Sequence, residues 1–350
     1  MGPPRSEDSD RHRRTRWWLL AVIAVVLLVP AGVAAYLVNR EPAQPVYLPF
    51  AVASDGTSID LGTLGGTQGT ATDVNASGAV MGLTVTADGA VHAFLSRGGT
   101  MIDLGVSRGA VALNDAGQVL VANMNPSPTG WQPSLWTDGT AQELTSDLGP
   151  LYEATDLNER GRVVGEILAS PRLYTWPTDD NSGSTATTVP IGVFWENGRV
   201  TLLETADAMI SRAIRIDENG AVLGQGRVKG SYPNHVLLWR AGSLTDLGEG
   251  GAIAMNDREQ IVLQKQEDND PGKRSLCYLW EAGRFTPLKN VDGTYLWAYD
   301  INGSGIVAGQ VDGRAAVWQD GHITLLKMHS KNSWAAALND AGAMVGTRQK

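Results

Sequence analysis

The chain is poor in the residues on which many exported and catalytic proteins depend. Among its 350 residues there are one cysteine and five histidines. A single cysteine cannot form an internal disulfide bond, and Cys277, within the apolar run 276–280, is expected to be a small buried side chain. His92, His235 and His329 have no serine, cysteine or carboxylate at a known motif spacing, so the sequence assigns no catalytic residue.

Basic side chains are scarce in most of the chain. The formal net charge is −9, and six of the arginines and three of the acids lie in the first 40 residues, which leaves 22 basic and 34 acidic side chains from Glu41 onward. Binding to a phosphate backbone rests on a cationic surface, so this balance excludes nucleic acid as a ligand. The 41 glycines and the modest charge are typical of a globular protein.

Long uncharged runs are absent except at residues 17–38. As a helix, these 22 residues would span roughly 33 Å, which is enough to cross a hydrocarbon core of about 30 Å. The arginines before this run predict a cytoplasmic tail at 1–16, a signal-anchor helix at 17–38 and a proline-containing linker at 39–46. The alternative is a signal peptide cleaved near residue 34, with secretion of the rest. Both interpretations place the remainder outside the cytoplasm.

What the sequence has in quantity is a repeat. Seven copies of an Asn-x-x-Gly turn phrase, each between short apolar runs, recur every 37–59 residues, and they begin at Asn75, Asn114, Asn158, Asp217, Asn256, Asn302 and Asn339. A second phrase alternates with it, an apolar run that ends in Trp and is followed by x-x-Gly, at Trp136, Trp195, Trp239, Trp280 and Trp318. Both phrases are typical of hairpin turns, so each copy predicts four short antiparallel strands. The recurring Trp is expected to pack between neighbouring copies.

The two ends of the repeat complete each other. Residues 51–61 align with residues 316–326, so the chain opens with the second half of a copy, and residues 335–347 form the first half of one. The sequence therefore predicts an all-β fold, a seven-bladed β-propeller of four-stranded antiparallel blades at 47–349, preceded by one N-terminal transmembrane helix. Joining the 47–61 and 333–347 half-blades would close the ring and remove open sheet edges.

The first full copy resembles the HAF-repeat family of predicted extracellular repeat proteins of bacteria. The resemblance rests on residues 60–66 (DLGTLGG), the turn at Asn75 and residues 92–95 (HAFL), and later copies have drifted from it. It implies an extracytoplasmic repeat domain, and it transfers no activity and no functional residues.

The connections at one end of the expected blades vary freely, whereas the turns at the other end are alike. Binding residues gather on loops that a rigid scaffold holds, so the variable end is the candidate binding face. Exposed aromatic rings with a few arginines suit a sugar or a peptide, although the same rings could simply cap the packing between blades. The candidate ligand-binding residues at this end are Trp131, Trp176, Trp297, Trp334, Tyr152, Tyr174, Tyr232, Arg108 and Arg212.

The sequence predicts no metal site and no cofactor. Residues 73–78 and 300–305 resemble the first half of a calcium loop, but the later ligand positions hold Met81, Thr84, Ala308 and Val311, which indicates hairpin turns. The predicted function is a membrane-anchored extracytoplasmic recognition or scaffold protein that binds a protein partner or an envelope saccharide. The alternative is a propeller-type hydrolase or lyase with a site at the channel mouth. The identity of the ligand and the oligomeric state are not encoded in any motif.

Overall fold

The computed structural model describes residues 45–124, 131–169, 189–231, 234–267, 274–328, 330 and 332–350. Residues Val46–Lys350 form one compact unit. The predicted membrane-spanning segment, 17–38, lies outside the described residues, and within the described part no helix is long and apolar enough to cross a membrane.

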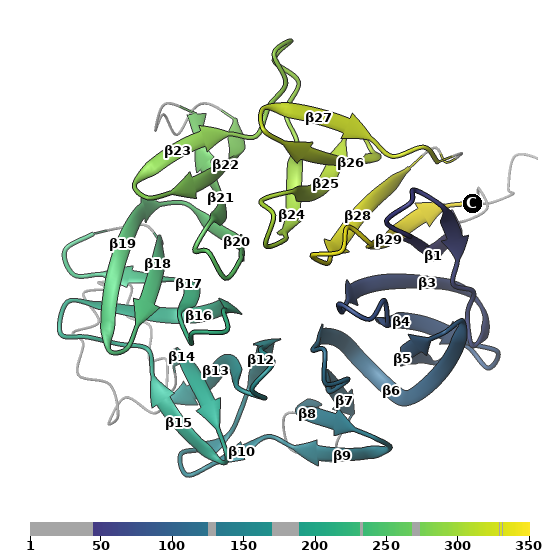
Figure 1. Cartoon of the computed structure of the whole chain (residues 1–350). Helices are drawn as coiled ribbons and strands as arrows, with labels where there is room; N and C mark the ends of the chain where they lie inside the picture. The colour runs from purple at the N-terminus through teal and green to yellow at the C-terminus, as the bar shows by residue number, and fades with distance from the viewer. Residues whose placement is uncertain are drawn as a thin grey trace, which may run out of the picture. The chain divides into compact units, whose positions relative to one another are not determined.

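Strands build this unit, and they pair in chain order. Four four-stranded antiparallel sheets follow that rule, each with its first strand nearest a common centre (Figure 1). They are β12 (Glu153–Leu157), β13 (Val163–Ala169), β14 (Val189–Glu196) and β15 (Arg199–Leu202); β16 (Ala208–Ile216), β17 (Val222–Val228), β18 (His235–Arg240) and β19 (Ser243–Glu249); β20 (Gly251–Met255), β21 (Ile261–Gln266), β22 (Ser275–Glu281) and β23 (Arg284–Pro287); and β24 (Trp297–Ile301), β25 (Val307–Val311), β26 (Arg314–Gln319) and β27 (His322–Leu325).

A seven-stranded sheet contains two copies of the same pattern. Its strands are β3 (Gly65–Val74), β4 (Val80–Thr86), β5 (Val91–Arg97), β6 (Thr100–Leu113), β7 (Val119–Met124), β8 (Trp131–Thr137) and β9 (Thr140–Glu143). The long strand β6 pairs with β5 up to Val106 and with β7 from Ser107 onward. It is therefore the outer strand of one copy and the inner strand of the next. A two-stranded ribbon, β10 (Thr145–Ser146) and β11 (Gly149–Pro150), follows it.

One sheet joins the two ends of the compact unit. It contains β1 (Tyr47–Val52), β2 (Ser58–Asp60), β28 (Ser333–Leu338) and β29 (Met344–Gln349), in the order β2-β1-β29-β28. β1 and β29 pair over six residue positions. Phe50, in the middle of β1, is fully buried, and Lys350 N donates to Val46 O at 2.9 Å. The closing strands are therefore held by both backbone pairing and core packing.

The turn residues of neighbouring copies are linked in a circle of hydrogen bonds. In six of the seven copies the Asn side-chain Nδ2 donates to the backbone oxygen of the first turn residue in the next copy, at 2.8–3.2 Å, and the last link runs from Asn339 back to Asn75. The side-chain Oδ1 caps its own turn by accepting the backbone N–H four residues later, as Asn75 does from Ala79 at 2.9 Å. Because these side chains are buried, each link satisfies polar groups that would otherwise be costly. We call this set the turn circle.

The turns are not all of the predicted Asn-x-x-Gly form. In the Asn256 copy the fourth position is Glu259, which adopts the left-handed conformation (φ 56°) that Gly takes elsewhere, for example Gly78 at φ 78°. Its carboxylate pairs with Arg240, so a side-chain contact accompanies the backbone strain.

A register shift lies just before the turn in each of the seven innermost strands. These strands are β3, the second half of β6, β12, β16, β20, β24 and β28. In β12, for example, the shift lies between Ala154 and Asp156. A bulge re-aims the side chain that follows it. The bulge therefore sets the direction of the side chain two positions before each turn. The residue types at this position determine what lines the space between the ends of the innermost strands.

Apolar side chains fill the space between neighbouring sheets. Trp195 and Trp318 of the repeat are 6% and 4% exposed and pack with residues of the adjacent sheets. The other three repeat tryptophans are partly buried against similar clusters. Cys277 is 2% exposed, and burial raises the pKa of its thiol. The predicted packing roles of the tryptophans and of Cys277 are confirmed.

Candidate functional site

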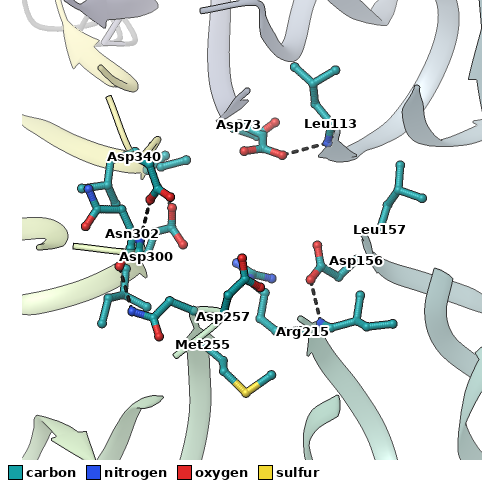
Figure 2. Close-up of a pocket in the computed structure, with 18 of the residues that line it drawn as sticks. Asp73, Leu113, Asp156, Leu157, Arg215, Met255, Asp257, Asp300, Asn302 and Asp340 are labelled. Atoms are coloured by element: carbon teal, nitrogen blue, oxygen red, sulfur yellow. Dashed lines mark hydrogen bonds between the residues drawn. The ribbon is translucent and has the colours of Figure 1, made fainter. Parts of the chain in front are cut away.

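A polar cavity of about 240 Å³ lies beside the turn circle, between the ends of the innermost strands. In Figure 2 the side chains of Asp73, Asp156, Asp300 and Arg215 project from separate strands toward this shared space. All four occupy the position two residues before a turn, directly after the bulge. The other three copies have alanine there, Ala112, Ala254 and Ala337. The small alanine side chains leave space for the cavity, and the charged side chains line it.

Each of the three carboxylates also links two neighbouring copies of the repeat. Asp73 Oδ2 accepts the backbone N–H of Leu113 at 2.8 Å, and Asp156 and Asp300 accept from Ile216 and Leu338 at 2.8 and 3.0 Å. The calcium-like phrases at 73–78 and 300–305 therefore form hairpin turns whose first aspartate accepts a hydrogen bond from the next copy of the repeat. In the part of the chain that the structure describes, no group of three or more His, Cys, Asp or Glu side chains is arranged to hold a metal ion.

The surrounding protein shifts the protonation of this cluster. Desolvation and the neighbouring Asp300 carboxylate raise the pKa of Asp73 to about 7. Desolvation also raises the pKa of Asp300, to about 6, and that of Asp156, while Arg215 opposes both shifts. Burial disfavours the charge on Arg215, but the three carboxylates together raise the pKa of its guanidinium. The cavity can thus take up and release a proton near neutral pH while Arg215 stays charged.

The opposite end, where the innermost strands begin, holds the candidates from the sequence. We call it the loop end. Arg108 and Tyr152 line one cavity of about 210 Å³ together with Glu153. Tyr152 is 48% exposed, and its backbone N–H donates to Glu166 O at 2.8 Å, so the backbone that carries the exposed ring is fixed.

Arg212 joins this group through two carboxylates. Its guanidinium lies 3.8 Å from Glu153 and 3.6 Å from Glu166. The Glu166 side chain is only 8% exposed, and desolvation together with the Glu153 charge raises its pKa to about 7, against the effect of Arg212. Glu153 and Glu166 are paired residues on the neighbouring strands β12 and β13, so strand pairing places these two carboxylates side by side.

Trp297 lines a separate cavity at the loop end, of about 340 Å³. Its side chain is 49% exposed. Tyr295 lies in the same cavity, and the Arg274 guanidinium is 4.4 Å from its ring centre. The Arg274 guanidinium also lies 3.7 Å from Glu267, so a paired cation lines this cavity together with two aromatic side chains.

The other sequence candidates have different outcomes. Trp334 is half-buried and packs on Tyr47, with ring centres 5.7 Å apart, so it caps β1 and β28 and lines neither loop-end cavity. Trp131 begins β8 opposite Met124. Trp176, Tyr174 and Tyr232 lie outside the described residues.

Two histidines for which the sequence predicted no partner, His92 and His235, each lie within hydrogen-bond distance of an aspartate. His92 Nδ1 lies 2.8 Å from Asp103, and Gly105 N donates to the same carboxylate. His235 repeats this arrangement with Asp246 and Gly248. In this second case Ser231 Oγ also lies 2.7 Å from His235 Nε2. Each aspartate is eleven residues after its histidine, a spacing that strand pairing brings together and that no sequence motif singled out.

No protein-family model matches the chain, and no curated protein matches it. Solved structures do. The chain is similar to the β-propeller domain of the Trilobed protease from Pyrococcus furiosus, with a TM-score of 0.52 and 11% identity over 78% of this chain and 86% of that one. It is also similar to the Pyrococcus horikoshii acylaminoacyl peptidase, with a TM-score of 0.54 and 12% identity over 77% of this chain and 48% of that one. The predicted β-propeller fold is confirmed, and at such identities only the fold is shared.

Proposed function

We propose that the chain is a membrane-anchored recognition protein whose seven-bladed propeller lies outside the cytoplasmic membrane and binds a protein partner or an envelope saccharide at its loop end. The anchor is the apolar segment 17–38, and the repeat is of the HAF type. The observation that carries the proposal is the pair of loop-end cavities, each with a half-exposed aromatic ring beside an arginine.

The chemistry of these cavities favours recognition. Tyr152 with Arg108 and Trp297 with Arg274 each combine a flat apolar surface with a charged hydrogen-bond donor. This combination suits the faces and hydroxyl groups of a sugar, or an aromatic or acidic peptide side chain. Leaving large rings half exposed costs apolar burial, which a bound ligand would recover.

The test is capture on glycan and peptide arrays with the full chain in detergent. Tyr152→Ala and Trp297→Ala should each weaken capture by at least about tenfold, because contact aromatics at binding centres commonly contribute 1–2 kcal/mol or more. Ile59→Ala is the matched control, since Ile59 is a 54% exposed apolar residue on β2. This strand is at the opposite edge of its sheet from the innermost strand β28. Equal capture by all three variants and the parent would contradict the proposal.

One observation favours the hydrolase alternative. Ser231, His235 and Asp246 form a hydrogen-bonded chain with the connectivity of a catalytic triad, serine to Nε2 and aspartate to Nδ1. Among the residues that the structure describes, no serine is hydrogen-bonded to the ring in the same His–Asp–Gly arrangement at His92, which favours a structural role that links the third strand to the fourth.

We therefore expect no covalent labelling of the chain by a fluorophosphonate probe. Ser231→Ala should leave ligand capture unchanged and cost only the stability of one hydrogen bond, about 1 kcal/mol. A phosphonylated Ser231 in the parent, absent in both Ser231→Ala and His235→Ala, would establish the hydrolase instead.

A further inference from the structure

The turn circle has one exceptional member. Six copies begin with asparagine and donate an Nδ2 hydrogen bond to the next copy, whereas the fourth begins with Asp217. In other respects Asp217 behaves like its counterparts. It is 3% exposed, its backbone oxygen accepts from Asn158 Nδ2 at 3.1 Å, and its Oδ1 accepts from Ala221 N at 2.6 Å. Only the outgoing link, toward Asn256, lacks a nitrogen donor.

The oxygen that replaces this donor has no partner. Asp217 Oδ2 is buried without a hydrogen bond, and because Oδ1 accepts from Ala221 as the asparagine Oδ1 atoms do in their turns, Oδ2 is the atom that replaces Nδ2. An ionised carboxylate has acceptors only, so it would place a buried negative oxygen toward a carbonyl oxygen. Buried charges of this kind are strongly unfavourable unless paired.

We propose that Asp217 is a neutral carboxylic acid in the folded protein at neutral pH and that its Oδ2–H donates the missing link of the turn circle, to the backbone oxygen of Asn256. A proton on Oδ2 turns the orphaned acceptor into a donor, so the acid does what Nδ2 does in the other copies. The link between β16 and β20 then exists only while the proton is bound, which makes this junction of the ring sensitive to pH.

The charged groups around Asp217 support the neutral form. Desolvation raises its pKa, the Asp257 carboxylate on the next turn raises it further, and hydrogen bonds from Ala221 and Asn219 act in the opposite direction. Glu218, next in the chain, accepts from Glu159 N and donates its own N–H to Asp257 at 3.0 Å, so acidic side chains flank the turn on both sides. Arg162, whose guanidinium lies beside Gly220 of the same turn, is already paired with Glu196 at 2.8 Å.

The direct test is carboxyl ¹³C NMR of the full chain labelled at aspartate. At pH 7 the parent should show a neutral carboxyl resonance that is missing from Asp217→Asn, and Asp73→Asn should leave that resonance in place. A spectrum in which Asp217 has the carboxylate shift at pH 7 would overturn the proposal.

Thermal unfolding supplies an independent measurement. Because the folded-state pKa of Asp217 is raised, the bound proton contributes stability that is complete below about pH 4, the unfolded value, and is lost as pH rises through the folded pKa. Asp217→Asn carries a permanent donor, so its unfolding midpoint should exceed that of the parent by about 2–4 °C at pH 8 and match it near pH 4.

The reverse substitution at an equivalent position of the turn circle is the control for effects of Asp217→Asn that are unrelated to the proton. Asn302→Asp should create a second acid in the circle, with a midpoint that falls below the parent at pH 8 and recovers on acidification. A midpoint for Asp217→Asn that is equal to or below the parent at pH 8, or a difference that does not change with pH, would contradict the proposal.

Discussion

Residues at equivalent positions of the repeat make different contacts in different sheets. The repeat tryptophans are one example. Trp195 Nε1 donates to Thr145 O at 2.8 Å, and Trp318 Nε1 reaches Lys289 O at 3.4 Å. Trp239 Nε1 is buried without a partner. The rings therefore share a packing role, but the polar edge of the indole is satisfied in some sheets and not in others.

Replacing these tryptophans by phenylalanine separates packing from hydrogen bonding. Trp195→Phe should lower the free energy of unfolding by about 1 kcal/mol more than Trp239→Phe, because only the Trp195 indole N–H has a hydrogen bond to lose. Both variants lose similar ring area. Urea unfolding followed by far-UV circular dichroism measures the difference, and equal losses would show that the Trp195 hydrogen bond has no net value.

At the scale of the element, the second strand of several sheets lies very close to the first. A Cβ placed on Gly309 would lie 2.1 Å from Trp297 O, and one on Gly346 would lie 2.0 Å from Trp334 O. These glycines pair next to the bulges of the innermost strands. The close approach lets each bulge form, and the bulge in turn aims the next side chain at the centre.

Gly309→Ala should therefore lower the free energy of unfolding by about 2–3 kcal/mol, as overpacking in a fixed backbone does. Gly109→Ala is the matched control, since a Cβ there meets nothing closer than 3.6 Å. We expect that control to be neutral or slightly stabilising, because alanine restricts the unfolded chain. Chemical denaturation of both variants decides the matter, and an equal effect would show that the close approach is relaxed at no cost.

At the scale of the whole molecule, the ends of the repeat form one sheet. β29 lies between β1 and β28 and is hydrogen-bonded to both. Val345 is fully buried against the cluster that contains Phe94 and Val80 of the first full copy. The last strand thus contributes to packing on both sides of the join.

Deleting residues 344–350 should destabilise the whole compact unit, by at least about 5 kcal/mol, which is comparable to the total stability of many domains. It removes a central strand and exposes two edges that favour aggregation. Deletion of Lys350 alone is the control and should cost little. A truncated chain that keeps a cooperative thermal transition near the parent midpoint would show that β1 and β28 hold the ring without β29.

The amount that could be predicted from the sequence differs between the fold and the site. Hairpin dipeptides and alternating apolar runs act locally, so the strands around Asn75 and the packing of Trp318 could be predicted directly. The loop-end candidates were only partly brought together. Arg108 and Tyr152 share a cavity, whereas Trp334 packs on Tyr47. Which ring meets which neighbour depends on contacts between sheets, and no local pattern encodes those.

The repeat itself determined that the chain folds into four-stranded units and that its first and last strands are two halves of one of them. Only the tertiary structure decided what the irregular members of the repeat do. Asp73, Asp156, Asp300 and Arg215 stand far apart in the chain and share a cavity because every innermost strand has a bulge at the same height. The sequence shows that Asp217 differs from the asparagines at the other six positions. Only the tertiary structure shows that its Oδ2 lacks a partner where the asparagines donate to the next copy. Turn chemistry is local, whereas the protonation of a buried carboxyl depends on every group packed against it.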